Sequence, residues 1–514
     1  MWPYLKKWYI DNKYLFLVLF FATFLLFYRI SYRTFWGDEM AVLDYLKQGP
    51  VEFLIKYWQA PDNHPPLYYF LVLIVSKILP GTELTVRFVS AVSGLGIVYL
   101  VYLFTFRIIG NRRIALLVAF FTTLSSYFIL ISQMARYHSL AGLLSLLVLY
   151  LFYVLYFEGY TKKVWCLFLV SLVAIGYADY LHFFYNIFII NLVYLYTFIK
   201  SKPILPFLKW FIGQLIVAFF LSPLIWIIYH RVIIQGDGGW EKTNLLVNSW
   251  RHIILAIFFH IYSFLFGENI FPWDYTFFIL GVTVLLVVLF GFIKGFCNKT
   301  WSSKELFIIL LSVGLIVLNT FFMNVANPRY NFIVYPKFVF VAYPLWIITM
   351  VLVLNKLGGK VRAVIFLCWA IVSIFGLWNF YQAKNYLNPS YFRTFESFKY
   401  VQTHSQVGHY LAITPYAGQG FYDFYKDNYF KNLIPVSLQE IAKLPDSAKL
   451  WFFSAASEAS DASVGTEDLL PPKYKVLDRF DSVQLDPTFK KTKELFLDRP
   501  SYIYKYTLFL LEKI

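Results

Sequence analysis

Long apolar runs dominate this sequence and restrict its possible folds more than any other feature. Runs of about 17 to 25 residues recur along the 514-residue chain, and each could cross roughly 30 Å of hydrocarbon. Backbone polar groups in lipid must bond within their own segment, so runs of this length predict helices and not barrel strands. With 59% hydrophobic and 14% charged residues, the composition predicts an α-helical polytopic membrane protein.

Hydropathy predicts about eleven transmembrane helices, with ends uncertain by several residues. They are expected near residues 13–31, 84–106, 114–132, 139–157, 164–181, 183–199, 210–230, 275–293, 305–323, 332–354 and 363–381. The connections richest in Lys and Arg all fall on one side: 107–113, 162–163, 200–203, 294–299 and 355–362. The positive-inside rule predicts that this side and the N-terminus are cytoplasmic, and an odd number of spans puts the C-terminus outside. We therefore expect a multi-pass protein of the inner (plasma) membrane.

The net charge of +16 does not indicate a nucleic-acid partner, because the basic residues gather in these connections. Membrane lipids are the partners that this distribution indicates.

Two domains are predicted. Residues 1–381 form the membrane module, with a first outer loop at 32–83 and a second at about 231–274. Residues 382–514 carry frequent charges and no spanning run, which predicts a soluble extracytoplasmic α/β domain. Its alternating stretches "HYLAITPY", "KLWFFSA", "YKVLDRFDSVQLD" and "YIYKYTLFLL" predict strands, and "SLQEIAKLP" predicts a short helix.

An acidic pair, Asp38 and Glu39, follows the first span and is expected on the outer membrane surface. "GDEMAVLDYLKQG" is plausible as an amphipathic helix, in which Asp38 would be a helix N-cap and Glu39 would favour the N-terminal dipole. The functional interpretation makes one carboxylate a general base at the membrane surface. Neighbouring helical positions point about 100° apart, so one carboxylate would face the site while the other orients or caps.

His64 precedes Pro65 and Pro66, which can open a helix. The apolar run that follows is short for a span and predicts a re-entrant or interfacial helix. His64 could be a cap or an interfacial ring, or it could donate to a phosphate or bind a metal.

Ionisable residues recur at the outer ends of other spans. Arg87 there could snorkel to the surface or hold an anion. The further candidates are Arg136, Tyr137 and His138 in "SQMARYHSL", Asp179 and His182 in "ADYLHFF", and Arg329 and Tyr330 in "NPRYNFIVYP". Each alone has a structural explanation, but together they indicate a polar cavity for an anionic, lipid-borne substrate.

These motifs, in this order and on this side, resemble the GT-C glycosyltransferases, specifically bacterial and archaeal relatives of protein O-mannosyltransferases and lipid A aminoarabinose transferases. The carriers are "WGDE" at 36–39, "HPPLYYFL" at 64–71, "VRFVSAVSG" at 86–94, "SQMARYHSL" at 132–140, "DYLHFF" at 179–184 and "NPRYNFIVYP" at 327–336. The likeness covers nearly the whole chain, including the outer C-terminal domain.

The resemblance implies inverting transfer of a monosaccharide from a polyprenyl-phosphate carrier to a hydroxyl of a lipid, glycan or protein acceptor. It implies that Asp38, beside Glu39, is the base and that Arg87 lies near the donor phosphate. It also implies that Arg136, Arg329 and Tyr330 line the pocket, which we expect to include Tyr137 and His182.

His64 stands where the aminoarabinose transferases carry a lysine, which argues against that branch and leaves any metal site undecided. No cofactor is identified, although the site leaves room for a divalent metal. Three alternatives stay open: a ligase of the O-antigen type with a polyprenyl-diphosphate donor, a transporter of lipid-linked sugars, and a scaffold whose outer domain binds partners.

Overall fold

The structure is a computed structural model, and it divides the chain into two compact units. It describes residues 2–43, 45–59, 64–200, 204–229, 250–325, 336–384, 390–414, 419–457, 467, 470–483, 491 and 504–514. The helical unit comprises Met1–Ile30 and Gln48–Trp378, and the sheet unit comprises Ser31–Lys47 and Asn379–Ile514. The segment with the acidic pair thus groups with the C-terminal part, whereas the expected boundary at 381 placed it with the membrane module.

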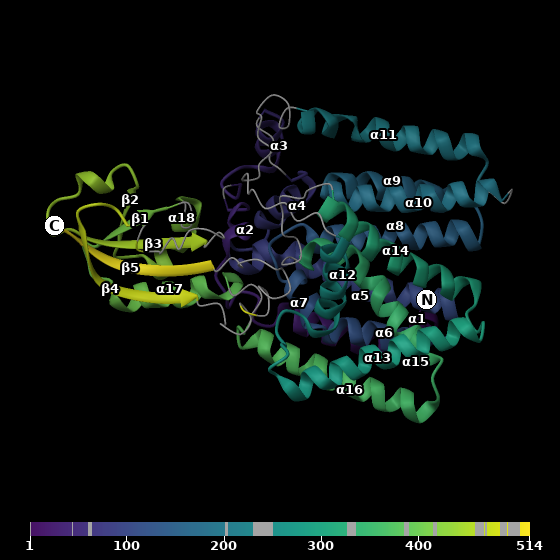
Figure 1. Cartoon of the computed structure of the whole chain (residues 1–514). Helices are drawn as coiled ribbons and strands as arrows, with labels where there is room; N and C mark the ends of the chain where they lie inside the picture. Colours follow the sequence, from purple (N-terminus) through teal and green to yellow (C-terminus); the bar gives the residue numbers. More distant parts are fainter. Residues whose placement is uncertain are drawn as a thin grey trace. The chain divides into compact units, whose positions relative to one another are not determined.

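The helical unit is built almost entirely of helices (Figure 1). Their bounds are α1 Trp2–Phe27, α3 Pro50–Gln59, α4 Leu67–Ser76, α5 Glu83–Ile109, α6 Arg112–Leu124, α7 Ser126–Ser132, α8 His138–Phe157, α9 Lys162–Ala178, α10 Tyr180–Ile199, α11 Phe207–Tyr229, α12 Trp250–Phe266, α13 Tyr275–Cys297, α14 Ser303–Val325, the 3₁₀ helix η3 Pro336–Ala342, α15 Tyr343–Asn355 and α16 Gly359–Tyr381. Helix α9 packs against α8, α10 and α11, and Figure 1 shows these four side by side. The short helix expected after His64 is α4.

Eight helices in the described residues are long and apolar enough to cross a membrane. A ninth span results if α6 and α7 are counted together, although they are bent by 67° where a single straight span was expected at 114–132. The bend lies at Ser125, whose extended backbone ends α6 and whose hydroxyl accepts from the Phe128 N–H at 3.2 Å. The other two expected spans correspond to the apolar part of α1, Asn12–Phe27, and to α9, which has 17 residues. A multi-pass membrane protein is confirmed, and the number eleven stays a prediction.

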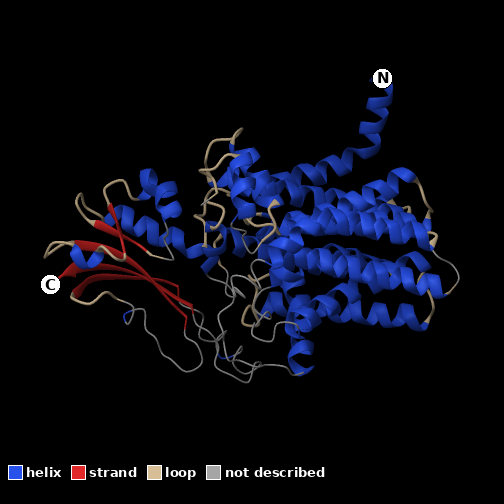
Figure 2. Ribbon diagram, turned by 90° about the horizontal axis from the view of Figure 1, so that it is seen from above, coloured by secondary structure: helices blue, strands red, loops and turns tan. Residues whose placement is uncertain are grey.

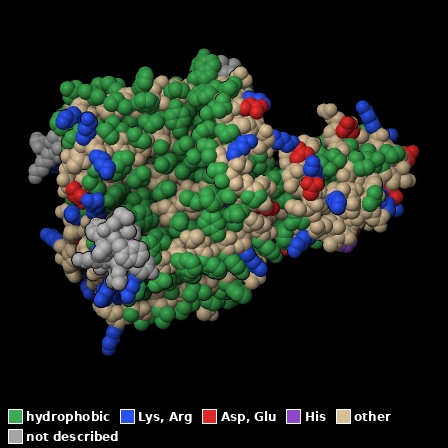
Figure 3. Space-filling model, turned by 180° about the vertical axis from the view of Figure 1, so that it is seen from behind, with side chains coloured by type: hydrophobic (Ala, Val, Ile, Leu, Met, Phe, Trp, Pro, Cys, Tyr) green, Lys and Arg blue, Asp and Glu red, His purple; other side chains and the backbone are tan. Residues whose placement is uncertain are grey.

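Hydrophobic side chains cover most of the helical unit on the face drawn in Figure 3, as a surface in contact with lipid requires. Exposed Phe219, Phe258 and Leu286 are examples, each at least 60% accessible.

The basic connections meet at one end of the helical unit. Contacts that join them are Arg107 Nε to Glu158 Oε1 at 2.8 Å, Lys209 Nζ to the Tyr160 ring centroid at 4.8 Å, the Tyr156 and Phe307 rings at 5.0 Å, and Lys356 Nζ to Glu305 Oε1 at 2.8 Å. Helix α8 runs away from this end for 20 residues, or roughly 30 Å. The N-termini of α8 and α10 therefore lie at the opposite end, as their expected outer position requires.

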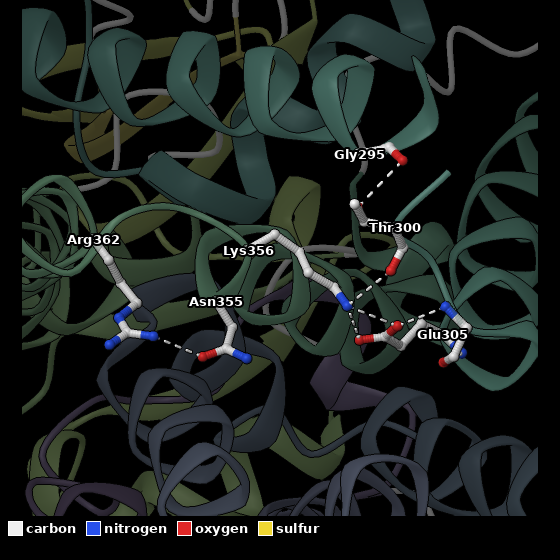
Figure 4. A network of polar contacts seen from close by, with 7 residues as sticks. Gly295, Thr300, Glu305, Asn355, Lys356 and Arg362 are labelled. Carbon is white, nitrogen blue, oxygen red and sulfur yellow. Dashed lines mark hydrogen bonds and ion pairs between the residues drawn. The ribbon is translucent and has the colours of Figure 1, made fainter. Parts of the chain in front are cut away.

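Polar contacts at the basic end hold the end of α15 to α14, to the α13–α14 connection and to α16 (Figure 4). Lys356 Nζ donates to Glu305 at 2.9 Å and to the Thr300 carbonyl at 3.2 Å, and Arg362 donates to Asn355 at 2.9 Å. These contacts close a helix connection, so we assign them a structural role.

Helix α12 was missed by the sequence analysis, which treated 231–274 as a loop. Its apolar part, Ala256–Phe266, is shorter than a span, which explains why hydropathy did not identify it.

The sheet unit has a five-stranded mixed sheet of order β2-β1-β3-β5-β4 (Figure 2). The strands are β1 Tyr410–Ile413, β2 Ile434–Ser437, β3 Lys449–Ser457, β4 Tyr474–Val483 and β5 Tyr504–Lys513. Strands β1, β3, β4 and β5 fall in the four predicted stretches. The stretch "SLQEIAKLP" begins at the last residue of β2 and contains only the 3₁₀ helix η4, Ile441–Lys443, so the predicted helix was wrong in type.

Alternation along β3 buries both faces of the sheet. Leu450 and Phe452 point into a core with Ile441 of η4. Phe453 points to the other face, where its ring lies 5.6 Å from Phe398 of α17, Ser390–His404. Successive side chains of a strand point to opposite faces, so a strand covered on both faces carries apolar side chains on each.

The segment Ser31–Lys47 is held within the sheet unit by α18, Gln419–Tyr429. Phe35 N–H donates to Tyr425 Oη at 3.0 Å, and its ring packs edge-on against Phe424 at 5.2 Å. The Lys47 ammonium donates to the Asp423 carboxylate and holds the pKa of Asp423 below its ordinary value. The acidic pair therefore belongs to a segment anchored at both ends.

Candidate functional site

Arg136 lies in the short connection between α7 and α8, at the end of the helical unit away from the basic connections. Its side chain is 7% exposed. One guanidinium nitrogen lies 2.8 Å from His64 Nε2, and another donates to Tyr69 Oη at 3.4 Å. Ser90 of α5 donates to its backbone carbonyl at 3.0 Å. The chain thus holds a buried cation between α4, α5 and α8.

His64 stacks beside Tyr137, with ring centroids 4.8 Å apart. Arginine has no acceptor, so His64 Nε2 must accept from Arg136 and carry a lone pair. His64 therefore orients the guanidinium in this arrangement, and the predicted donation to a phosphate would have to come from its other nitrogen. His64, Arg136 and Tyr137, three of the predicted site residues, thus lie next to one another.

Arg87 is 2% exposed, so its guanidinium does not snorkel to the membrane surface. It donates to the Ile30 carbonyl at 2.7 Å. Gln133 Nε2 lies within 3.2 Å of the carbonyls of Leu25, Leu26 and Tyr28. Carbonyls at a helix C-terminus lack partners within the helix, so Gln133 caps α1, and Arg87 holds the turn that follows it.

His182 and Asp179 form a buried pair at the start of α10. Asp179 is the N-cap, and its carboxylate accepts from the His182 backbone at 2.9 Å and also from the His182 ring. His138 has His182, His64, Arg136 and Lys337 within electrostatic reach. An arginine, a lysine and three imidazoles thus gather at this end of the unit.

Lys337 and Tyr69 were not singled out from the sequence. Lys337 is 4% exposed and opens η3, where its ammonium lies 5.3 Å from the Phe338 ring centroid. It sits in "NFIVYPKFVF", next to the motif that carries Arg329, and a lysine between apolar residues was the available signal.

Asp38 and Glu39 lie in the sheet unit, and their roles differ. Helix α2, Gly37–Met40, has Trp36 as its N-cap, so the N-cap interpretation of Asp38 was wrong. Glu39 is 1% exposed and reaches back to the Trp36 N–H at 3.3 Å, as in a capping box. Turns follow Met40, so the expected helix over 37–49 is only four residues long. Asp38 is half-buried.

The remaining predicted residues, Arg329 and Tyr330, lie outside the described residues. No group of three His, Cys, Asp or Glu side chains that could hold a metal ion occurs in the described ranges.

Residues 63–226 match the family model of dolichyl-phosphate-mannose-protein mannosyltransferase. An uncharacterized protein of Aquifex aeolicus strain VF5 is 28% identical over 273 residues, which are 51% of this chain and 52% of that protein. The alignment thus spans about half the length of this relative.

The structure is also similar to crystal structures of ArnT from Cupriavidus metallidurans. The apo structure matches with a TM-score of 0.55 and 10% identity over 97% of this chain and 98% of that chain. The structure bound to undecaprenyl phosphate matches with a TM-score of 0.55 and 10% identity over 96% and 98%.

The chain shares its fold with ArnT over nearly its whole length, and residues 63–226 are similar to the mannosyltransferase family. The family match includes His64, Arg87, Arg136 and His182, which all lie between residues 63 and 226. The chain joins a unit with membrane-spanning helices to a sheet unit within one polypeptide.

Substituting Arg87 with Met is expected to destabilise the protein, because the Ile30 carbonyl in the turn after α1 loses a buried charged donor. The cost should be about 1.5–3 kcal/mol. Thermal unfolding in detergent measures it. Arg107→Met is the matched control: Arg107 is 41% exposed in its pair with Glu158, and exposed pairs contribute about 0–1 kcal/mol. Equal losses of stability for the two variants would contradict a stabilising role for the contact between Arg87 and the Ile30 carbonyl.

Proposed function

We propose that this protein is a membrane glycosyltransferase that moves a monosaccharide from a polyprenyl-phosphate carrier to a hydroxyl of a lipid, glycan or protein acceptor. The observation that carries the proposal is the buried group of cations and imidazoles around Arg136, at the end of the helical unit opposite the basic connections. A lipid phosphate is the anion that reaches such a position from a membrane. Support comes from the fold shared with ArnT, one structure of which contains undecaprenyl phosphate.

The charge balance of the reaction explains the need for cations. The acceptor oxygen attacks the anomeric carbon while the bond from that carbon to the phosphate oxygen breaks. The carrier phosphate leaves with one more negative charge than it had in the donor. Arg136, with Arg329 and Lys337, stabilises this charge in a water-poor site, where fixed donors act most strongly.

Asp38 takes the proton of the acceptor hydroxyl, on the side opposite the leaving phosphate, so the anomeric configuration inverts. Glu39 holds the backbone of α2 and does not react. Arg87 holds the turn that follows α1 through the Ile30 carbonyl. Tyr137, His182 and Tyr330 line the donor site.

Transfer should be detected with the purified full-length protein in detergent. It is incubated with membrane extracts and a panel of radiolabelled polyprenyl-phosphate sugars, with polyprenyl-diphosphate sugars as a parallel arm. Incorporation from a monophosphate donor supports the proposal. Incorporation only from diphosphate donors indicates a ligase instead, and no incorporation from either contradicts transferase activity.

The site requires an outward orientation, which cysteine labelling can test. In a cysteine-free background, Val407→Cys in the sheet unit, 85% exposed, should react with a membrane-impermeant thiol reagent in intact cells. Asn111→Cys in the basic connection between α5 and α6 is also exposed and should react only after permeabilisation. The reverse pattern would place the acidic pair in the cytoplasm and exclude the proposed acceptor side.

A further inference from the structure

Buried hydrogen-bond acceptors without partners occur on α10 and α14, two helices that pack against each other, apart from the Arg136 contacts. Asn186 of α10 and Asn319 of α14 are fully buried, and His182 is 1% exposed. We name His182 Nε2, Asn186 Oδ1 and Asn319 Oδ1 the acceptor cluster. None of these three atoms has a hydrogen-bond partner among the described residues.

Each asparagine amide is oriented by a backbone carbonyl, which can only accept. Asn186 Nδ2 donates to the His182 carbonyl at 2.7 Å and to Ser145 Oγ at 2.6 Å. Asn319 Nδ2 donates to the Phe338 carbonyl at 3.0 Å. A carbonyl oxygen has no hydrogen to give, so the nitrogen of each amide must face it. The unpartnered atom of each side chain is therefore its oxygen, which is an acceptor.

His182 follows the same logic. Its Nδ1 faces the Asp179 carboxylate, which accepts the ring proton. In the neutral imidazole the other nitrogen, Nε2, then carries a lone pair. Asp179 is 4% exposed, so this pairing is formed in the interior and fixes the tautomer.

Packing brings the three side chains to one region of the helical unit. Asn186 lies one turn after His182 on α10, and α10 packs against both α8 and α14. The 3₁₀ helix η3 packs against α8 and α14 as well. Its Phe338 holds Asn319 through the carbonyl, and its ring lies 5.7 Å from that of His138.

Buried acceptors without donors are costly, and three of them in one region call for a ligand that supplies O–H or N–H groups. A phosphate offers acceptors and does not meet this need. The hydroxyl groups of a sugar do.

We propose that the acceptor cluster binds hydroxyl groups of the sugar carried by the donor. This inference rests on the proposed function and divides the donor between two sets of residues. Arg136 and Lys337 take the phosphate, and His182, Asn186 and Asn319 take the sugar. The cluster then determines which sugar the enzyme uses, because a hydroxyl missing from the sugar leaves a buried acceptor unpaired.

Equilibrium binding to the purified full-length protein in detergent tests this division. The probes are undecaprenyl phosphate and its mannosyl, glucosyl and galactosyl derivatives. At least one sugar-bearing carrier should bind more tightly than the bare carrier. Asn186→Leu and Asn319→Leu, in different helices, should each reduce this preference roughly three- to tenfold and leave affinity for the bare carrier unchanged.

Asn191→Leu is the matched control on α10. Asn191 Nδ2 donates to the Ile187 carbonyl at 2.8 Å, and Oδ1 accepts from Trp210 Nε1 at 2.9 Å, so both ends of its amide are paired. The same substitution there should leave the preference for the sugar-bearing carrier intact. Thermal unfolding of all three variants checks that they fold.

Two results would overturn the inference. One is equal affinity of the wild-type protein for the bare carrier and every sugar-bearing carrier. The other is a loss of affinity in Asn186→Leu and Asn319→Leu that is the same for all four probes, as a structural or water-binding role predicts. Transfer is measured separately on the same panel. A protein that prefers a sugar-bearing carrier without transferring its sugar would contradict the proposed function and leave this inference standing.

Discussion

Asp38→Asn should abolish sugar transfer in a protein that still folds. The amide has nearly the same shape as the carboxylate but cannot take the proton of the acceptor hydroxyl. General base catalysis contributes about 10²- to 10⁴-fold, so kcat should fall by that factor. The donor contacts of Arg136 are untouched, so the donor KM should change little. Initial rates against donor concentration measure both quantities.

Glu39→Gln is the matched control, because it makes the same chemical change one residue away. Glu39 is buried and accepts from the Trp36 N–H, and a glutamine oxygen accepts from that N–H equally well. Its rate should therefore stay within a few-fold of wild type. If Asp38→Asn retained the wild-type rate, or if Glu39→Gln lost as much, Asp38 could not be the base.

The elements predicted correctly from the sequence are those that depend only on neighbouring residues, through apolar length or alternation. Apolar length predicted α5, α8, α10 and α13, because lipid leaves a long apolar segment no alternative to a helix. Alternation predicted β3 and β5, because successive side chains of a strand point to opposite faces of the sheet. For the acidic pair, the sequence analysis expected one carboxylate to orient or cap; Glu39 does cap α2, whereas Asp38, named as the N-cap, does not.

Distant contacts explain what the sequence analysis missed. The Phe35 N–H bonds to Tyr425, 390 positions later, and no local pattern reports that α18 holds the acidic segment. The short α2 has the same origin, because the aromatic contacts of Phe35 override the helical pattern that follows it. Lys337 was missed because its value depends on burial beside His138, which only the fold reveals.

Arg136→Met should weaken donor use by about 10²- to 10³-fold, as expected for the loss of a fixed donor to a developing negative charge. Arg136→Lys should recover only part of this loss. The planar guanidinium contacts His64 with one nitrogen and Tyr69 with another, whereas an ammonium is a single point of charge. The lysine variant should therefore keep a measurable kcat with a raised donor KM. The methionine variant should have a much lower kcat and a donor KM raised further.

Arg107→Lys provides the comparison at the basic end, where the same substitution meets Glu158 and Tyr150 and should change transfer by no more than about twofold. A stability role for Arg136 is separated by thermal unfolding, because a purely structural arginine would lower kcat in proportion to the fraction of unfolded protein and leave KM unchanged. A phosphate ligand instead shifts the donor KM in the folded protein, since binding and transition-state stabilisation are both lost with the guanidinium. An Arg136→Lys variant equal to wild type in both constants would show that only the charge matters there, and would move the assignment of the phosphate-binding fork to another cation such as Arg329.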